Sequence, residues 1–142
     1  SDIMLSPNWL ENLFKRLMRS VIVTSRLVER KHPKFGVFPG ADYAEFGDHP
    51  NNFKKDMFLN WCMQNSVDGT REGGSYGPCM FYKDLAELAG LYPGGNIHGG
   101  NFQRITRYGD EEFFSRLKKI GVSHITALDS IVYHFKEGER EE

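Results

Sequence analysis

The sequence predicts an α/β fold in which helices flank a mixed β-sheet. Residues 109–121 (GDEEFFSRLKKIG) place phenylalanine, leucine and isoleucine side chains on one helix face, and a glycine ends the pattern. Residues 124–128 follow as a short, mostly apolar strand. Nearer the N-terminus, a predicted helix over residues 6–18 precedes a β-branched run at 21–24. Helices that alternate with short buried strands are typical of α/β domains.

The first helix is predicted from its capping residues and its apolar stripe. Ser6 is expected to cap the helix, and Pro7 suits the first helical position. The side chains expected on the stripe are Trp9, Leu10, Leu13, Phe14, Leu17 and Met18. Residues 6–18 are therefore expected to form an amphipathic helix.

The middle of the chain is predicted to hold shorter elements separated by glycine-rich loops. The predicted elements are a strand at 36–38, a helix at 53–65 capped by Asn52, a strand at 78–82 and a helix at 83–89. Glycine-rich loops cover residues 68–77 and 93–101. The second loop is either a mobile lid over a cleft or a plain surface loop. The charged tail at 136–142 is expected to fray.

Composition narrows the class of protein. With 142 residues, the chain has the length of one domain, and 39% hydrophobic and 26% charged residues are typical of a globular protein. A net charge of −1 argues against nucleic acid as a partner. No apolar run reaches the roughly 18 residues that a membrane span requires. The spacing of Cys62 and Cys79 matches neither a metal nor a redox motif, so we expect reduced thiols and a cytoplasmic location.

Titratable side chains flank the last predicted helix and strand. Asp110, Glu111 and Glu112 begin the helix, where acids interact favourably with the helix dipole, and this alone explains many such clusters. His134 follows the next strand among large apolar residues. Ligands of open α/β sheets bind at the ends of such elements. We therefore expect a carboxylate of the helix and the imidazole of His134 to face one cleft.

Three segments of the chain resemble family 2 glycosyltransferases with the GT-A fold. Residues 109–121 resemble the ED-x-D-F-x-x-R-L-x-x-x-G segment of that family, with Gly109 in place of the first acid. Residues 129–135 (DSIVYHF) resemble the segment that ends the catalytic domain. Residues 2–13 (DIMLSPNWLENL) resemble the run that begins with the last acid of the metal-binding D-x-D motif.

The resemblance implies a role for each of six side chains. Sugar transfer from a nucleotide donor requires positive charge at the leaving diphosphate and a base for the attacking hydroxyl. Asp110 corresponds to the catalytic base, and Asp2 and His134 to ligands of Mn²⁺ or Mg²⁺. The residues expected to bind substrate are Glu111, Glu112 and Arg116, the last by orienting an acid one turn away.

The resemblance extends over the acceptor side of the catalytic domain only. We expect residues 1–142 to form a single domain from which the N-terminal nucleotide-binding half is absent, associated with that half or with another chain. The expected function is part of a metal-dependent, inverting transfer of a sugar from a nucleotide-sugar donor to a hydroxyl acceptor. The alternative is a non-catalytic structural or interaction module derived from such a domain.

Overall fold

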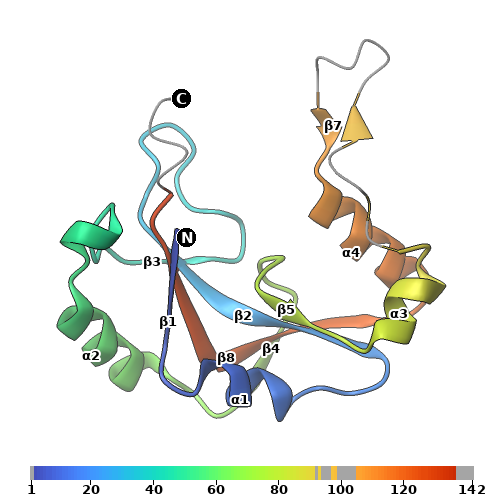
Figure 1. Cartoon of the computed structure of the whole chain (residues 1–142), viewed down its shortest axis with the longest axis horizontal. Helices are drawn as coiled ribbons and strands as arrows, with labels where there is room; N and C mark the ends of the chain where they lie inside the picture. The colour runs from blue at the N-terminus through green and yellow to red at the C-terminus, as the bar shows by residue number, and fades with distance from the viewer. Residues whose placement is uncertain (1, 92, 94–96, 99–104, 137–142) are drawn as a thin grey trace.

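The computed structural model describes residues 2–91, 93, 97–98 and 105–136 (Figure 1). The described chain is α/β, with a mixed six-stranded sheet flanked by helices, and this confirms the predicted fold class at that level. The glycine-rich loop at 93–101 and the tail beyond Lys136 lie largely outside the described residues. None of the helices in the described ranges has the length and hydropathy needed to cross a bilayer.

Two long strands form the centre of the sheet. β2 (Val21–Glu29) and β8 (Ser123–His134) pair in parallel along their length (Figure 1). Four short strands complete the sheet: β1 (Ile3–Leu5) and β4 (Thr70–Glu72) pair antiparallel with β8, while β5 (Cys79–Met80) and β3 (Asp42–Tyr43) pair with β2. The strands predicted at 21–24 and 124–128 are confirmed, and both are longer than expected.

The pairing of β2 with β8 changes register in the middle of the sheet. Ser25 lies opposite Ala127, whereas the next residue, Arg26, lies opposite Ile131. The extra residues of β8 form a bulge, which bends a strand and increases its twist. The bulge lets one continuous strand carry both the predicted strand and the segment that ends in His134.

The predicted helices are all present, with shifted ends. The structure contains α1 (Trp9–Phe14), α2 (Lys55–Asn65), α3 (Lys83–Leu88), α4 (Gly109–Lys119) and a 3₁₀ turn, η1, at Pro50–Asn52. The prediction that Ser6 caps the first helix is wrong, because the Ser6 hydroxyl accepts the Ile131 N–H at 3.0 Å. The prediction that Asn52 caps the second helix is also wrong, since Asn52 ends η1 and its side chain accepts the N–H groups of Asp48 and His49.

One predicted strand is absent from the structure. Two further strands form a small sheet of their own. The strand expected at 36–38 is replaced by a single bridge between His32 and Gly36. β6 (Ile97–His98) and β7 (Ile105–Arg107) pair antiparallel, apart from the main sheet and immediately before α4 in the chain.

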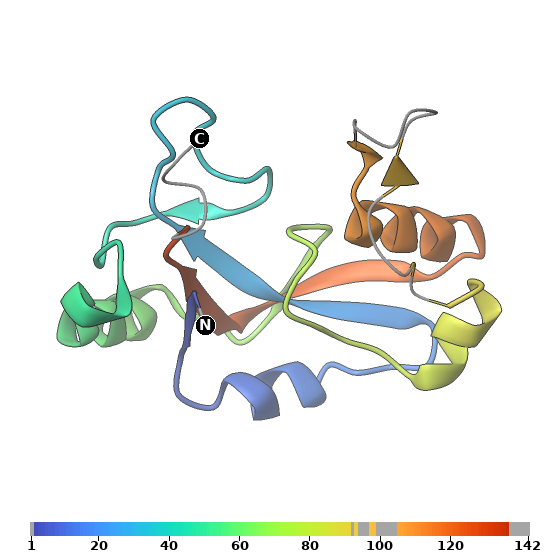
Figure 2. The ribbon, with the colours of Figure 1, turned by 45° about the horizontal axis from the view of Figure 1, so that its top comes forward.

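Helices pack on both faces of the central strands. α1 covers one face, where Leu13 packs with Val21 and Val23, and α4 covers the opposite face, where Phe113 packs with Ile22 (Figure 2). A third cluster joins α2 to the ends of β2 and β8; it includes Val28, Phe58, Cys62, Tyr133 and Phe135. These contacts hold α1, α4 and α2 against the two long strands.

Burial agrees with most of the prediction for α4 and with less of the prediction for α1. Phe114 is 8% exposed and Leu117 is 1% exposed, as expected for the buried face of α4, but Ile120, expected on the same face, lies just beyond the helix and is 48% exposed. In α1, Leu13 is buried, but Leu10 and Phe14 are 53% and 67% exposed. The predicted apolar stripe of the first helix is therefore only partly covered by the described chain.

Candidate active site

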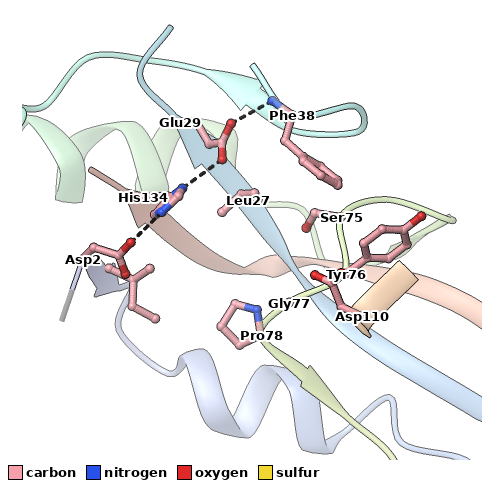
Figure 3. Close-up of a pocket in the computed structure, with 11 residues that line it drawn as sticks. Asp2, Leu27, Glu29, Phe38, Ser75, Tyr76, Gly77, Pro78, Asp110 and His134 are labelled. Carbon is pink, nitrogen blue, oxygen red and sulfur yellow. Dashed lines mark hydrogen bonds and ion pairs between the residues drawn. The ribbon is translucent and has the colours of Figure 1, made fainter. Parts of the chain in front are cut away.

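A cavity of about 370 Å³ lies at the carboxyl ends of the two long strands (Figure 3). Glu29 is the last residue of β2 and His134 the last residue of β8, and Asp2 immediately precedes β1. Because β2 and β8 are parallel, their carboxyl ends meet at one edge of the sheet, where α/β folds bind ligands. The register of β1, with Ile3 opposite His134, brings Asp2 to the same edge.

One side of the cavity is a network of charged side chains. The His134 ring lies between two carboxylates, with Nδ1 at 2.9 Å from Glu29 Oε1 and Nε2 at 2.7 Å from Asp2 Oδ2. The other oxygen of Glu29 accepts the Phe38 N–H at 2.8 Å and pairs with Lys136 Nζ at 3.0 Å. A ring that donates to both carboxylates is an imidazolium, so this geometry favours protonated His134.

The pKa values of the two central groups shift in opposite directions. Burial lowers the pKa of His134, but the hydrogen bonds and charges of Glu29 and Asp2 outweigh burial, and the net pKa is raised. Burial raises the pKa of Glu29, but the hydrogen bonds from His134, from the Phe38 N–H and from Lys136 make the net pKa lower than usual. Both shifts favour the ion pair.

Glu29 and Lys136 were missed by the sequence interpretation. Glu29 is 3% exposed, but the predicted strand before it ends at Thr24, so Glu29 lies outside every predicted element. Lys136 is 7% exposed, so the expectation that the tail frays from this residue is wrong. The missed signal was the apolar pair Leu27 and Val28, which resumes the apolar run after Thr24 and leads into a carboxylate, together with a lysine directly after an apolar run.

Asp110 lies on the opposite side of the cavity, in the first turn of α4. Figure 3 shows its carboxylate beside Ser75 and Tyr76, across the space from Asp2 and His134. Asp110 Oδ1 accepts the N–H of Glu111 at 2.7 Å, and this bond orients the carboxylate. The structure thus places Asp2, Asp110 and His134 around one cavity, while their chemical roles stay predictions.

The three residues expected to bind substrate lie outside the lining of this cavity. Glu111 is exposed on α4. Glu112 and Arg116 form a part-buried pair one turn apart, at 3.1 Å, which is the arrangement expected if Arg116 orients an acid. Arg116 also donates to the Leu91 carbonyl at 3.4 Å. Contact of these side chains with an acceptor stays a prediction.

The side chains on the charged side of the cavity suit a metal cation that is bound in part by the phosphates of a substrate. Within the described ranges, no group of three His, Cys, Asp or Glu side chains is placed to hold a metal ion. Asp2 and His134 supply two ligands, and Mg²⁺ typically uses one or two protein ligands together with waters and substrate phosphates. Glu29 lies behind His134, as carboxylates commonly do behind imidazoles that ligate a metal. These residues therefore fit Mn²⁺ or Mg²⁺, provided that His134 Nε2 gives up its proton and its bond to Asp2.

Comparisons with family models, with curated proteins and with solved structures found no match for this chain. The function is therefore inferred from the cavity and from the sequence motifs that point to the same residues.

Proposed function

We propose that this chain is the acceptor-side, base-bearing part of a metal-dependent inverting glycosyltransferase of family 2 with the GT-A fold. It would transfer a sugar from a nucleotide-sugar donor to a hydroxyl acceptor. The observation that carries the proposal is the cavity itself. Motifs from both ends of the chain and from a helix between them contribute Asp2, His134 and Asp110 to one space, with Asp110 facing the other two.

Asp110 would act as the base. In an inverting transfer, the acceptor oxygen bonds to the anomeric carbon as the bond from that carbon to the diphosphate oxygen breaks on the opposite face. The carboxylate takes the proton that the acceptor hydroxyl loses. Because the Glu111 N–H holds one carboxylate oxygen, Asp110 keeps its orientation while substrates exchange.

Asp2 and His134 would act at the leaving-group end. They would hold Mn²⁺ or Mg²⁺, which when bound supplies positive charge to neutralise the diphosphate. Glu29 would keep its bond to His134 Nδ1 and so direct Nε2 into the cavity. Lys136, which pairs with Glu29, offsets the charge of that buried carboxylate.

A second function is favoured by one feature of the same network. Both ring nitrogens of His134 already contact carboxylates, so Asp2, His134 and Glu29 also join β1, β8 and β2 as a purely structural network. A non-catalytic structural or interaction module derived from a glycosyltransferase would keep such a network without binding a cation. A measurement of metal binding therefore distinguishes the glycosyltransferase from the structural module.

The proposal is tested by titrating the chain with Mn²⁺ in the presence and absence of a nucleoside diphosphate, with free Mn²⁺ measured by electron paramagnetic resonance. We expect binding that His134→Ala and Asp2→Asn abolish. Asp84→Asn, which changes a half-exposed acid of α3 paired with Arg19, should leave it unchanged. Wild-type protein that binds no Mn²⁺, or variants that bind it equally well, would exclude the metal site and favour the structural module.

A further inference from the structure

Ser75 presents a buried hydroxyl to the cavity without a partner in the described part of the protein. The residue is 2% exposed, and its Oγ forms no hydrogen bond with the described residues. Ser75 lines the cavity, and Figure 3 shows its hydroxyl directed toward the space between the two sides. Buried hydroxyls of native proteins are nearly always hydrogen-bonded to protein or to ordered water, so the unpaired Ser75 hydroxyl beside the cavity is a hydrogen-bonding position that a water or a ligand hydroxyl can fill.

The backbone around Ser75 is held in place from several directions. The Gly73 N–H donates to the His124 carbonyl at 2.8 Å, and the Thr126 hydroxyl donates to the Gly73 carbonyl. Gly74 has φ +122, and a Cβ at this position would lie 2.1 Å from Thr126 Oγ1. A Cβ on Gly40 would in turn lie 3.0 Å from Gly74 Cα. The loop is therefore packed too closely for the backbone to turn Ser75 toward another partner.

The surroundings of Ser75 suit a neutral polyol better than a phosphate. Asp110 lies on the same side of the cavity, and its carboxylate repels an anion but accepts hydrogen bonds from hydroxyl groups. Tyr76, Phe38 and Leu27 add apolar surface to the lining, against which the C–H faces of a pyranose can pack. His134 lies on the opposite side.

We propose that Ser75 Oγ binds a hydroxyl group of a carbohydrate acceptor and holds that sugar beside Asp110. This assignment deepens the proposed function and rests on it. It names a carbohydrate as the class of acceptor and Ser75 as a residue that binds it. The hydroxyl can donate to the acceptor, accept from it, or do both.

The test uses methyl glycosides of glucose, galactose and mannose as probes. Each is titrated into the 142-residue chain at millimolar concentrations, and binding is followed by the amide NMR shifts of Ser75, Tyr76 and Gly77. We expect at least one glycoside to bind. Ser75→Ala should weaken that binding about threefold to tenfold, the effect of losing one neutral hydrogen bond. Ser75→Cys, which replaces the hydroxyl with a slightly larger thiol that is a weak donor, should give a similar loss.

A matched control separates binding from folding. Ser130 is also fully buried, but its hydroxyl lies 3.2 Å from Ser25 Oγ and donates to the Trp9 carbonyl at 2.9 Å. Ser130→Ala should lower the melting temperature by several degrees, about 5 °C. Ser75→Ala should leave the melting temperature unchanged or raise it, because no hydrogen bond within the protein is lost.

Three outcomes would overturn the assignment: no glycoside binding by the wild-type chain, equal binding by the Ser75 variants, or a melting temperature that Ser75→Ala lowers as much as Ser130→Ala does. The first two would exclude Ser75 as a carbohydrate-binding residue, and the third would show that its hydroxyl supports the fold. The Mn²⁺ titration tests the proposed function independently of Ser75. In that titration, Ser75→Ala should bind Mn²⁺ like the wild type.

Discussion

At the scale of single residues, Glu29 is the centre of the charged network. Its two oxygens contact a ring nitrogen, an ammonium group and a backbone N–H, and the side chain is almost fully buried. Removal of one member of a buried ion network leaves the others uncompensated, whereas an exposed pair contributes little. The same network that orients His134 therefore also stabilises the fold.

We predict that Glu29→Gln lowers the free energy of unfolding by on the order of 3–5 kcal/mol, because His134 and Lys136 lose their common counter-charge. Urea denaturation measures the change. Glu45→Gln is the matched control, since Glu45 is half-exposed and lies 3.8 Å from Arg30; it should cost roughly 0–1 kcal/mol. Equal losses from both variants would show that the Glu29 network does not stabilise the fold.

The two pKa shifts predict a defined pH dependence of stability. The raised pKa of His134 contributes stability that is complete below its ordinary value of 6.5 and is lost as pH rises through the raised value. The lowered pKa of Glu29 contributes stability that is complete above its ordinary value of 4.5 and is lost as pH falls through the lowered value. The network should therefore contribute most between pH 4.5 and 6.5.

Denaturation across a pH series tests this window. His134→Gln should remove the decline in the free energy of unfolding on the alkaline side, because the variant has no imidazole to lose a proton. If the wild type and His134→Gln show the same alkaline decline, His134 is not charged in the folded chain.

The two cysteines should react slowly with thiol reagents. Burial raises the pKa of Cys62 to about 11, and burial together with the Asp110 charge raises the pKa of Cys79 to about 11. Since the thiolate is the reactive form, a rise from 9.0 corresponds to a thiolate fraction about 100-fold lower at neutral pH. Labelling with Ellman's reagent at pH 7.5 should be slow in native protein and fast in urea. Equal rates in both conditions would contradict the burial of these thiols.

At the scale of elements, α4 couples the core to the cavity. Its first turn carries Asp110, and one turn further on its buried face begins with Phe113 and Phe114. Leu117→Ala should cost on the order of 2–5 kcal/mol, because Leu117 is 1% exposed and packs on β2 through Ile22. Lys118→Ala, on the exposed face, is the control. An unchanged denaturation midpoint for Leu117→Ala would mean that α4 does not pack on the sheet through this face.

Elements with a strong local pattern were predictable, and those set by distant contacts were not. A run of β-branched residues identified β2, a short apolar run identified part of β8, and helical spacing identified α4. The start of α1 was wrong because Ser6 bonds to Ile131, a contact that no local pattern contains. Glu29 and Lys136 were missed for the same reason, since their burial depends on how the ends of β2 and β8 meet. Asp2, Asp110 and His134 were expected near one cleft because motif resemblance carries such long-range information, and all three line one cavity, while their roles stay predictions.

At the scale of the whole molecule, uncovered surface predicts association. β1 lies at the edge of the sheet, and Leu10 and Phe14 of α1, with Met18 after the helix, are more than half exposed. Open strand edges and contiguous apolar side chains are usually covered in stable proteins. We therefore predict that this chain is covalently continued or is packed on another chain. Light scattering of the 142-residue chain should show self-association, and a monodisperse monomer of 16.3 kDa would contradict the prediction.

The most direct test of the proposed function is the effect of Asp110→Asn on sugar transfer by the intact protein, including any chain that completes it. The assay follows release of nucleoside diphosphate with acceptor present, and donor binding is measured in parallel. Loss of the base should lower kcat by about 10²–10⁴ and leave the affinity for the nucleotide sugar nearly unchanged, whereas Asp84→Asn should behave as wild type. Turnover retained in Asp110→Asn would contradict the role of Asp110 as the base.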